Sequence, residues 1–394
     1  MAEINYSINN SKLKINIDGY VDSANAAEVE AKINEIRANN PATSIEVDCD
    51  KLKYISSAGL RIILRLKKAC SDTILTNVSS DVYEIFDMTG FTEMMEVRKA
   101  FRTISVEGCE AIGQGANGKV YRINPEIIVK VYKNPDALPE IERERELART
   151  AFVLGIPTAI PYDVVKIENG GYGSVFELLN AKSFAKLLVS GEKSVDEIAK
   201  LSVDLLKLIH STVVKPDSMP NMKEVATNWA LFTKDYLPED TYNKLSKLIN
   251  DVPDDLHMMH GDYHIKNVML QNGEVLLIDM DTLCYGHPVF ELASMYNAYI
   301  GYAEHDHDVV KRFLGISFET GVELWNKMLA LYFGSNDTDY LKSLEDKARI
   351  VGYTRILRRE IRRGGLDNET GRKVIENAKA KIIELAEKVD KLTF

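Results

Sequence analysis

The chain reads His260-Gly261-Asp262-Tyr263-His264-Ile265-Lys266-Asn267 and, a little further on, Leu276-Leu277-Ile278-Asp279. An aspartate is thus followed five residues later by an asparagine, and a second aspartate closes an apolar run. Transfer of a phosphoryl group needs a carboxylate that takes the proton of the acceptor hydroxyl, and two oxygen ligands for the Mg²⁺ on the phosphates. The spacing of these residues therefore predicts a phosphoryl-transfer site.

A glycine-rich stretch upstream supplies the matching half of such a site. It reads Ile112-Gly113-Gln114-Gly115-Ala116-Asn117-Gly118-Lys119-Val120-Tyr121, and Ile128-Val129-Lys130-Val131 follows about one hairpin later. Glycines let the backbone approach phosphates without Cβ clashes, Val120 would cover the adenine, and Lys130 lies in a β-branched run typical of a strand. Dinucleotide-binding folds also contain this glycine pattern, but there it lies between a strand and a helix. Here a second strand and a lysine follow, which favours the glycine hairpin of kinases.

The two halves together resemble the protein-kinase-like fold. The His260-Gly261-Asp262 opening is typical of its aminoglycoside phosphotransferase and choline kinase branch. The segment Gly286-His287-Pro288-Val289-Phe290-Glu291-Leu292-Ala293 resembles the G-x-P-x-x-D-L-A of small-molecule kinases, with Glu291 in place of the usual aspartate, and no Ala-Pro-Glu follows it. The resemblance implies an α+β bilobal domain, with a β-rich N-lobe over residues 106–180 and a helical C-lobe over residues 181–394.

The resemblance also implies the roles of individual residues toward ATP and Mg²⁺. Asp262 would be the catalytic base, and Asn267 and Asp279 would be the Mg²⁺ ligands. Asp281 would point elsewhere if the strand continued, which leaves it open between a metal contact and a structural role. Eight residues are expected to contact the nucleotide or its phosphates, the last two near the hinge whose backbone holds adenine: Gly113, Gly115, Gly118, Val120, Lys130, Glu144, Glu177 and Leu179.

The acidic partner of Lys130 is not decided by spacing. Glutamates crowd the following helix at positions 140, 142, 144 and 146, and a charge run of this kind is usually a solvated face. Phosphotransferases of the resembling type place the glutamate about three turns before a Gly-x-Pro, which here is Gly155-Ile156-Pro157. This selects Glu144, which shares a helical face with Ala148 and Phe152, and Glu146 is the fallback.

Residues 1–105 carry a separate pattern in which strands and helices alternate closely. Leu13, Ile15 and Ile17 alternate with polar residues as in a strand, and residues 59–69 carry an apolar helical face. The segments 22–26, 54–61 and 82–91 resemble the STAS domain of anti-sigma-factor antagonists, which implies an α/β fold. In that family a partner kinase phosphorylates a serine at the start of the second helix, which switches binding, and the matching residue here is Ser57. Ser56 replaces the aspartate that usually precedes this serine, so Ser57 is open between a phosphosite and the alternative that Ser56 or Ser57 merely caps the helix.

Composition narrows the class of protein. The 394 residues are 45% hydrophobic and 27% charged, an ordinary globular balance with room for two or three domains. The net charge of −10 argues against general nucleic-acid binding. No apolar run approaches a membrane span, no signal peptide is evident, and the four cysteines are scattered as free thiols of a cytosolic protein would be. A cytoplasmic protein is expected.

One basic feature stands out in the acidic C-terminal half. Arginines at positions 355, 358, 359, 362 and 363 fall at helical spacing and would form one stripe. A solvated helix face is one interpretation. The other interpretation is that the stripe binds an anionic substrate or the N-terminal domain, because this part of the resembling fold shapes the acceptor site.

The sequence therefore predicts a STAS-like regulatory or interaction domain fused to a phosphotransferase that moves the γ-phosphoryl group of ATP, with Mg²⁺, onto a hydroxyl of a small molecule. The alternative is a regulatory protein kinase, or an anti-sigma antagonist-type interaction protein that acts through the STAS-like domain, with Ser57 as a possible target. A nucleotide-binding pseudokinase is disfavoured because the set of catalytic residues is complete. No motif names the acceptor.

Overall fold

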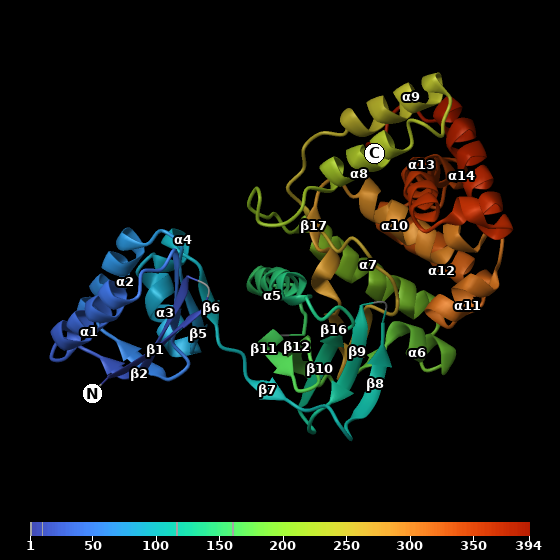
Figure 1. The fold of residues 1–394 in the computed structure, drawn as a ribbon. Helices are drawn as coiled ribbons and strands as arrows, with labels where there is room; N and C mark the ends of the chain where they lie inside the picture. The colour runs from blue at the N-terminus through green and yellow to red at the C-terminus, as the bar shows by residue number, and fades with distance from the viewer. Residues whose placement is uncertain (1, 10, 116, 160) are drawn as a thin grey trace. The chain divides into compact units, whose positions relative to one another are not determined.

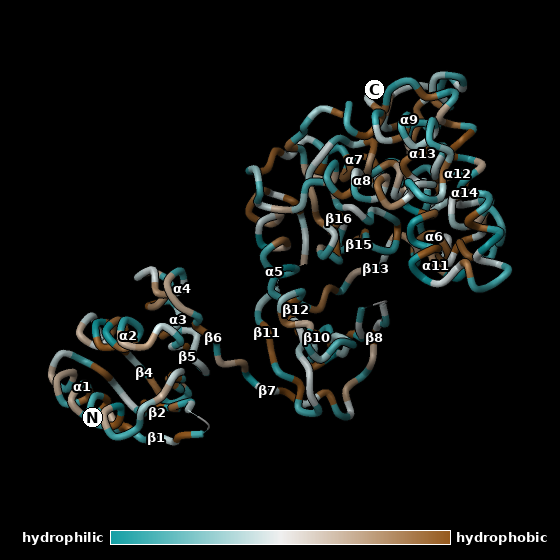
Figure 2. The backbone as a smooth tube through the Cα atoms, turned by 45° about the horizontal axis from the view of Figure 1, so that its top comes forward, coloured by the Kyte–Doolittle hydropathy of each residue, from teal (hydrophilic) through white to brown (hydrophobic). Residues whose placement is uncertain are grey.

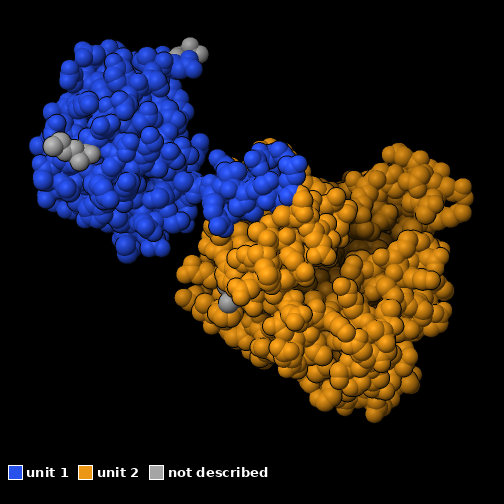
Figure 3. Space-filling model, turned by 90° about the horizontal axis from the view of Figure 1, so that it is seen from below, with its two compact units in different colours: residues 1–107, 164–170 blue, residues 108–163, 171–394 orange. Residues whose placement is uncertain are grey.

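The computed structural model describes residues 2–9, 11–115, 117–159 and 161–394. The chain divides into two compact units (Figure 3), of which unit 1 comprises residues 1–107 and 164–170 and unit 2 comprises residues 108–163 and 171–394. In the view of Figure 3, the face of unit 2 is hollowed.

Unit 1 is an α/β domain built on a mixed sheet with the strand order β1-β2-β3-β5-β6, in which β4 also pairs with β2 (Figure 1). The alternating residues Leu13, Ile15 and Ile17 of β2 are all buried, because every second side chain of a strand points to the same face. Its strands are β1 (Glu3–Asn9), β2 (Lys12–Val21), β3 (Ser44–Asp48), β4 (Leu52–Ile55), β5 (Thr73–Val78), β6 (Val97–Lys99) and β7 (Thr103–Ile104). Its helices are α1 (Ala26–Asn39), α2 (Ser57–Ala69), α3 (Ser80–Met88) and α4 (Phe91–Met94).

The N-terminal part of unit 2 is a sheet that carries the glycine hairpin. Its strands β8 (Glu110–Gln114), β9 (Gly118–Arg122), β10 (Ile127–Tyr132) and β12 (Tyr172–Glu177) lie in the order β12-β10-β9-β8, and β11 (Pro161–Ile167) begins in unit 2 and ends in unit 1. Lys130 lies mid-strand in β10, opposite Val120 of β9 and Ser174 of β12. One helix, α5 (Leu138–Val153), follows β10 and packs Ile141, Leu147 and Ala151 into the core.

The rest of unit 2 is mostly helical (Figure 1). Its helices are α6 (Phe184–Val189), α7 (Val195–Ser211), α8 (Met222–Phe232), α9 (Glu239–Asn250), α10 (Val289–Tyr299), α11 (Asp308–Leu314), α12 (Phe318–Phe333), α13 (Thr338–Arg362) and α14 (Glu369–Lys388). Short strands and turns interrupt them: β13 (Lys182–Ser183), β14 (Met258–Met259), β15 (Val268–Gln271), β16 (Glu274–Leu277), β17 (Cys284–Tyr285), and the 3₁₀ turns η1 (Met280–Thr282), η2 (Gly301–Ala303) and η3 (Gly365–Asp367). Every residue of α10 is buried, including the polar residues Glu291, Ser294 and Asn297.

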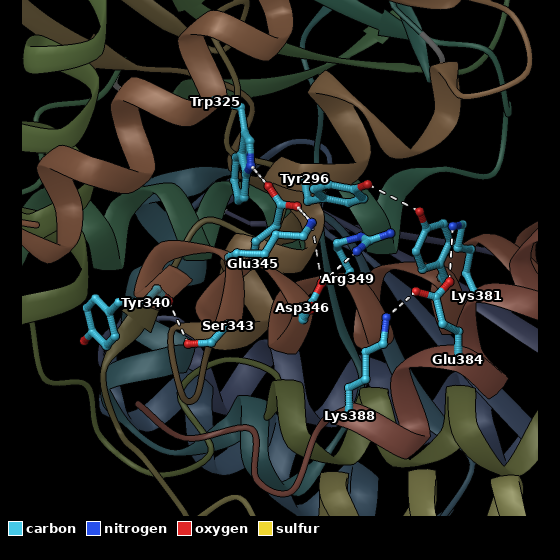
Figure 4. A network of polar contacts seen from close by, with 12 residues as sticks. Tyr296, Trp325, Tyr340, Ser343, Glu345, Asp346, Arg349, Lys381, Glu384 and Lys388 are labelled. Carbon is cyan, nitrogen blue, oxygen red and sulfur yellow. Dashed lines mark hydrogen bonds and ion pairs between the residues drawn. The ribbon is translucent and has the colours of Figure 1, made fainter. Parts of the chain in front are cut away.

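A polar network holds the long helix α13 against its neighbours (Figure 4). The indole Nε1 of the fully buried Trp325 donates to Glu345 Oε2 at 2.8 Å, which ties α12 to α13. On the next turn, Arg349 Nη1 lies 2.7 Å from Asp346 Oδ1, and the guanidinium also lies over the ring of Tyr296 from α10. Because these groups are largely desolvated, their contacts restrict the orientation of α13 about its axis.

The hydropathy of the chain varies over short distances along the sequence. Along the tube in Figure 2, short hydrophobic stretches alternate with hydrophilic ones in both units. Of the helices that the structure describes, none combines the length and the apolar character that crossing a bilayer demands.

Gly118 provides a test of the hairpin packing. A Cβ at this position would lie 2.2 Å from the carbonyl oxygen of Val131, a backbone atom that cannot rotate away. We expect Gly118→Ala to destabilise unit 2 by about 1–3 kcal/mol, the usual cost of overpacking. Gly115→Ala is the matched control, because its Cβ meets no atom within 4 Å. Thermal unfolding without nucleotide measures both variants, and equal midpoints for the two would contradict this packing.

Candidate active site

A cavity of about 490 Å³ in unit 2 collects the residues that the sequence singled out for nucleotide, metal and catalysis. Its walls come from the glycine hairpin, from β10, α5 and the end of β12, and from the segments around β15 and β16. The lining includes Gly113, Gly115, Gly118, Val120, Lys130, Glu144, Glu177, Leu179, Asp262, Asn267 and Asp279. The structure thus brings together every residue proposed for these roles.

Lys130 lies between two carboxylates. Its Nζ is 2.9 Å from Glu144 Oε1 on α5 and 3.0 Å from Asp279 Oδ1. Burial disfavours the charged ammonium, but the charges of Glu144 and Asp279 outweigh it and raise the pKa of Lys130 above its ordinary value. The lysine therefore stays protonated across the physiological pH range.

The choice among the four glutamates follows from burial. Glu144 is buried, whereas Glu140, Glu142 and Glu146 are exposed. The Glu144 carboxylate also accepts a short hydrogen bond from the hydroxyl of Tyr132, which the sequence analysis missed. Tyr132 is the last residue of β10, two positions after Lys130, so the alternation of the strand places both side chains on the α5 side.

The loop that carries Asp262 is held by a buried carboxylate. Glu291 of α10 accepts from the backbone N–H of His260 at 2.5 Å and from that of Gly261 at 3.1 Å. Gly261 has φ +81°, and a Cβ there would lie 2.4 Å from the carbonyl oxygen of Thr282, so the loop needs glycine at this position. The glutamate that replaces the usual aspartate thus still reaches the loop backbone.

Asp262 is placed to remain ionised. Burial disfavours its carboxylate, but hydrogen bonding to His264 and the positive charges of His264 and Arg355 lower the pKa of Asp262 below its ordinary value. Its backbone carbonyl accepts from Asn267 Nδ2 at 3.1 Å, which fixes the asparagine beside it. A carboxylate that is ionised at neutral pH can accept and orient the proton of a hydroxyl group.

Asp281 lines the cavity, whereas it was expected to point elsewhere if the strand continued. That expectation required the strand to continue, but β16 ends at Leu277 and Asp279 adopts a left-handed backbone with φ 66°. The turn η1 then carries Asp281 back toward the glycine hairpin, where Asn117 Nδ2 donates to its Oδ2 at 3.0 Å. Burial and the neighbouring charge of Asp279 raise the pKa of Asp281 to about 7.

In unit 1, the two serines at the start of α2 have different environments. Ser56 is the N-cap, and its side chain accepts from the backbone N–H of Gly59 at 3.4 Å. Ser57 is the first residue of the helix and is exposed. The cap that the sequence left open between them is therefore Ser56.

Comparisons with known proteins agree with this architecture. A model of a phosphotransferase enzyme family matches residues 108–325, and a model of the STAS domain matches residues 2–105. A candidate anti-sigma factor antagonist of Bordetella bronchiseptica, BtrV, is 32% identical over 85 residues, which are 21% of this chain and 72% of that protein.

Solved structures match at the level of the fold. A crystal structure of aminoglycoside phosphotransferase APH(4)-Ia has a TM-score of 0.50 at 11% identity, over 71% of this chain and 93% of that chain. ADP-bound APH(2'')-Ib has a TM-score of 0.46 at 15% identity, over 79% of this chain and 99% of that chain. The expected order of an α/β STAS-like domain followed by an α+β kinase-like domain is confirmed by the family matches and the first of these structures.

Glu291 allows a test of how the Asp262 loop is held. Burial disfavours the charged carboxylate of Glu291, but the imidazole of His210, 3.9 Å away, and the hydrogen bond from the backbone N–H of Gly261 keep the pKa of Glu291 below its ordinary value of 4.5. The charged carboxylate therefore contributes its full stabilisation above about pH 4.5, the pKa of the group in the unfolded chain. This contribution is lost as the pH falls through the lower pKa that Glu291 has in the folded protein. We expect Glu291→Ala to lower the free energy of unfolding by about 1–3 kcal/mol for each backbone N–H that is left unpaired.

The measurement is chemical denaturation of the wild type, Glu291→Ala and the exposed control Glu146→Ala at pH 7 and at decreasing pH. The stability gap between wild type and Glu291→Ala should narrow toward acid pH, and Glu146→Ala should follow the wild type throughout. A gap that does not change with pH would mean that the carboxylate is not charged in the folded protein.

Proposed function

The chain belongs to the phosphotransferase enzyme family, and from this premise we propose that it transfers the γ-phosphoryl group of ATP, with Mg²⁺, to a hydroxyl of a small molecule. The STAS domain would act as a regulatory or interaction module. The observation that carries the proposal is the convergence, around one cavity, of the glycine hairpin, the Lys130–Glu144 pair, Asp262, Asn267 and Asp279.

The cavity suits a nucleotide at its hinge end. Phe176, Glu177, Leu178 and Leu179 line it there. The N–H of Leu178 is already used, because it donates to the carbonyl of Glu126 at 2.7 Å. Adjacent N–H groups of extended backbone point to opposite sides, so we assign the carbonyl of Glu177 and the N–H of Leu179 to the adenine edge.

The phosphate end suits a magnesium complex. Mg²⁺ at nucleotide sites is commonly held by one or two protein side chains together with phosphate oxygens and water. Asn267 and Asp279 would supply those oxygens. Among the residues that the structure describes, no group of three or more histidine, cysteine or acidic side chains is placed to hold a metal without a nucleotide. When bound, Mg²⁺ would neutralise the charge that develops on the transferring phosphoryl group.

The protein's own groups then divide the remaining tasks. Lys130 is held in position by Glu144 and offers its ammonium to the phosphates, and Asp262 orients the acceptor hydroxyl and takes its proton. Little covalent chemistry is required of the protein, because such transfer depends mostly on positioning and on charge stabilisation.

A second candidate function is phosphorylation of the chain's own STAS domain. The observation that favours it is the exposure of Ser57, whose neighbour Ser56 takes the cap. The test is the intact mass of the full-length protein after incubation with Mg·ATP, compared with that of Ser57→Ala. A stoichiometric gain of one phosphate that disappears in Ser57→Ala would favour this second function over a small-molecule acceptor.

The primary test separates catalysis from nucleotide binding. We expect Asp262→Ala and Asp279→Ala each to lower kcat by at least about a hundredfold, the scale of a lost acid–base or metal contribution. Asp262→Ala should bind Mg·AMP-PNP as the wild type does, whereas Asp279→Ala should bind it more weakly. Turnover is measured as ADP release with a panel of alcohols, sugars and hydroxy acids. Near-normal turnover in either variant would remove the role assigned to it.

The Lys130 pair gives an independent prediction. We expect Lys130→Ala to raise the KM for ATP and to lower kcat, because the ammonium would contact phosphates in both the ground state and the transition state. Glu144→Gln should produce a milder form of the same defect, since Lys130 keeps its contact with Asp279. The exposed Glu146→Gln is the matched control on the same helix, and a defect in this control but not in Glu144→Gln would contradict the assignment.

A further inference from the structure

Four arginines of α13 form a row along one face of the helix: Arg355, Arg358, Arg359 and Arg362. Positions three, four and seven residues apart lie on one face of a helix, so the four guanidinium groups share one side of α13. We propose that this arginine row binds an anionic group of the phosphoryl acceptor, so that the acceptor is a hydroxyl compound carrying a phosphate ester or a carboxylate. The proposal rests on the function proposed above and names the class of acceptor.

Aromatic rings fix three members of the arginine row. The guanidinium of Arg355 lies 5.4 Å from the ring centroid of Trp229, and that of Arg358 lies 5.8 Å from the ring of Phe232, both on α8. A guanidinium over a ring is attracted by the ring's electrons and still offers its N–H groups at the edge. The third member, Arg359, lies 4.5 Å from the ring of Tyr302 in η2. A helix face that merely contacts solvent does not require its arginines to pack against aromatic rings.

The arginine row lacks the carboxylates that would neutralise it. Among the described residues, the recorded ion pairs give it one acidic partner, Glu360, which lies 3.0 Å from Arg359. Burial and the like charges of Arg362 and Arg355 lower the pKa of Arg358. Uncompensated positive charge therefore gathers here in a chain whose net charge is −10. Such a surface attracts an anion and repels a polycation.

The arginine row begins beside the catalytic loop. Arg355 Nη1 donates to Ser294 Oγ at 2.7 Å, and Ser294 Oγ donates to the carbonyl of Gly261 at 3.0 Å. The charge of Arg355 also acts on the carboxylate of Asp262. An acceptor whose hydroxyl lies at Asp262 therefore meets Arg355 first, and Arg358 and Arg362 follow one and two helical turns along α13, at about 5.4 Å per turn.

Arginine is suited to this task because its planar fork matches the oxygens of carboxylates and phosphates. Arg355 already uses part of its fork on Ser294 and sits next to Asp262, so its replacement would disturb catalysis as well as binding. Arg358 and Arg362 lie further from Asp262 along the helix, and Arg362 is exposed. These two residues are therefore the ones to vary.

The test uses four compounds that share a hydroxyl-bearing three-carbon backbone and differ in charge. They are glycerol 3-phosphate, glycerate, neutral glycerol and cationic 3-amino-1,2-propanediol. Each is titrated at low salt into the full-length protein saturated with Mg·AMP-PNP, and binding is followed by calorimetry and by the thermal midpoint. We expect at least one of the two anions to bind and to raise the midpoint, and glycerol and the amine to do neither; which anion binds distinguishes phosphate from carboxylate recognition.

Variants decide whether the arginine row is responsible. We expect Arg358→Ala and Arg362→Ala each to weaken binding of the anion about tenfold, the effect of losing one charge-assisted hydrogen bond, without changing the affinity for Mg·AMP-PNP. Arg358→Lys should lose less than Arg358→Ala because it keeps the charge. Lys373→Ala, which removes an exposed charge of α14 paired with Glu369, is the matched control and should bind the anion normally.

The outcomes separate this inference from the proposed function. If the anions do not bind, if they bind no better than glycerol, or if Arg358→Ala and Arg362→Ala bind them as the wild type does, the arginine row is not the acceptor site. If Mg·AMP-PNP itself does not bind the wild type, the proposed phosphotransfer from ATP fails instead.

Discussion

The site depends on the burial of one ammonium group. Removing a charged side chain from water is costly unless opposite charges and hydrogen bonds replace the water. Lys130 meets this condition only because Glu144 from α5 and Asp279 from the segment after β16 reach it from two directions. The strand β10, the helix α5 that follows it, and the turn after β16, whose Asp279 is 149 residues from Lys130, must therefore stay in register. The same requirement sets the distance between the glycine hairpin and the residues that face it across the cavity.

Local sequence patterns were sufficient to predict the elements whose formation depends on neighbouring residues. The alternation of Leu13, Ile15 and Ile17 and the glycine hairpin followed by a lysine strand identified strands that the structure contains. The order of an α/β domain and a kinase-like domain followed from motifs of this kind. The edge strands β1 and β6 were not foreseen. In β1 the apolar residues Ile4, Tyr6 and Ile8 alternate with polar ones, so the signal of a strand was present in the sequence, although Tyr6 and Ile8 are exposed in the structure.

The errors arose where one backbone torsion or one long-range contact decides the outcome. Asp281 was expected to point away only if the strand continued, and the left-handed backbone of Asp279 shows that it does not continue. Aspartate tolerates that conformation, but the neighbouring sequence gives no sign of it. The contacts of Asn117 with Asp281 and of Tyr132 with Glu144 depend on how distant elements pack, which spacing cannot show. Spacing alone did not decide among the four glutamates either; the resemblance selected Glu144, and Glu144 is the one that is buried and lies 2.9 Å from Lys130 in the structure.

In the proposed function, acceptor recognition and catalysis would be joined at a single arginine. The positive charge of Arg355 favours the ionised form of Asp262, and its hydrogen bond to Ser294 leads to the carbonyl of Gly261 in the same loop. Arg355 of the arginine row therefore acts on the carboxylate of Asp262, the proposed base, before any acceptor is present. An anion bound along the row would partly neutralise this field and make Asp262 a slightly stronger base when its substrate arrives. A cationic acceptor would add to the field and weaken the base, so the electrostatics that disfavour its binding would also disfavour its reaction.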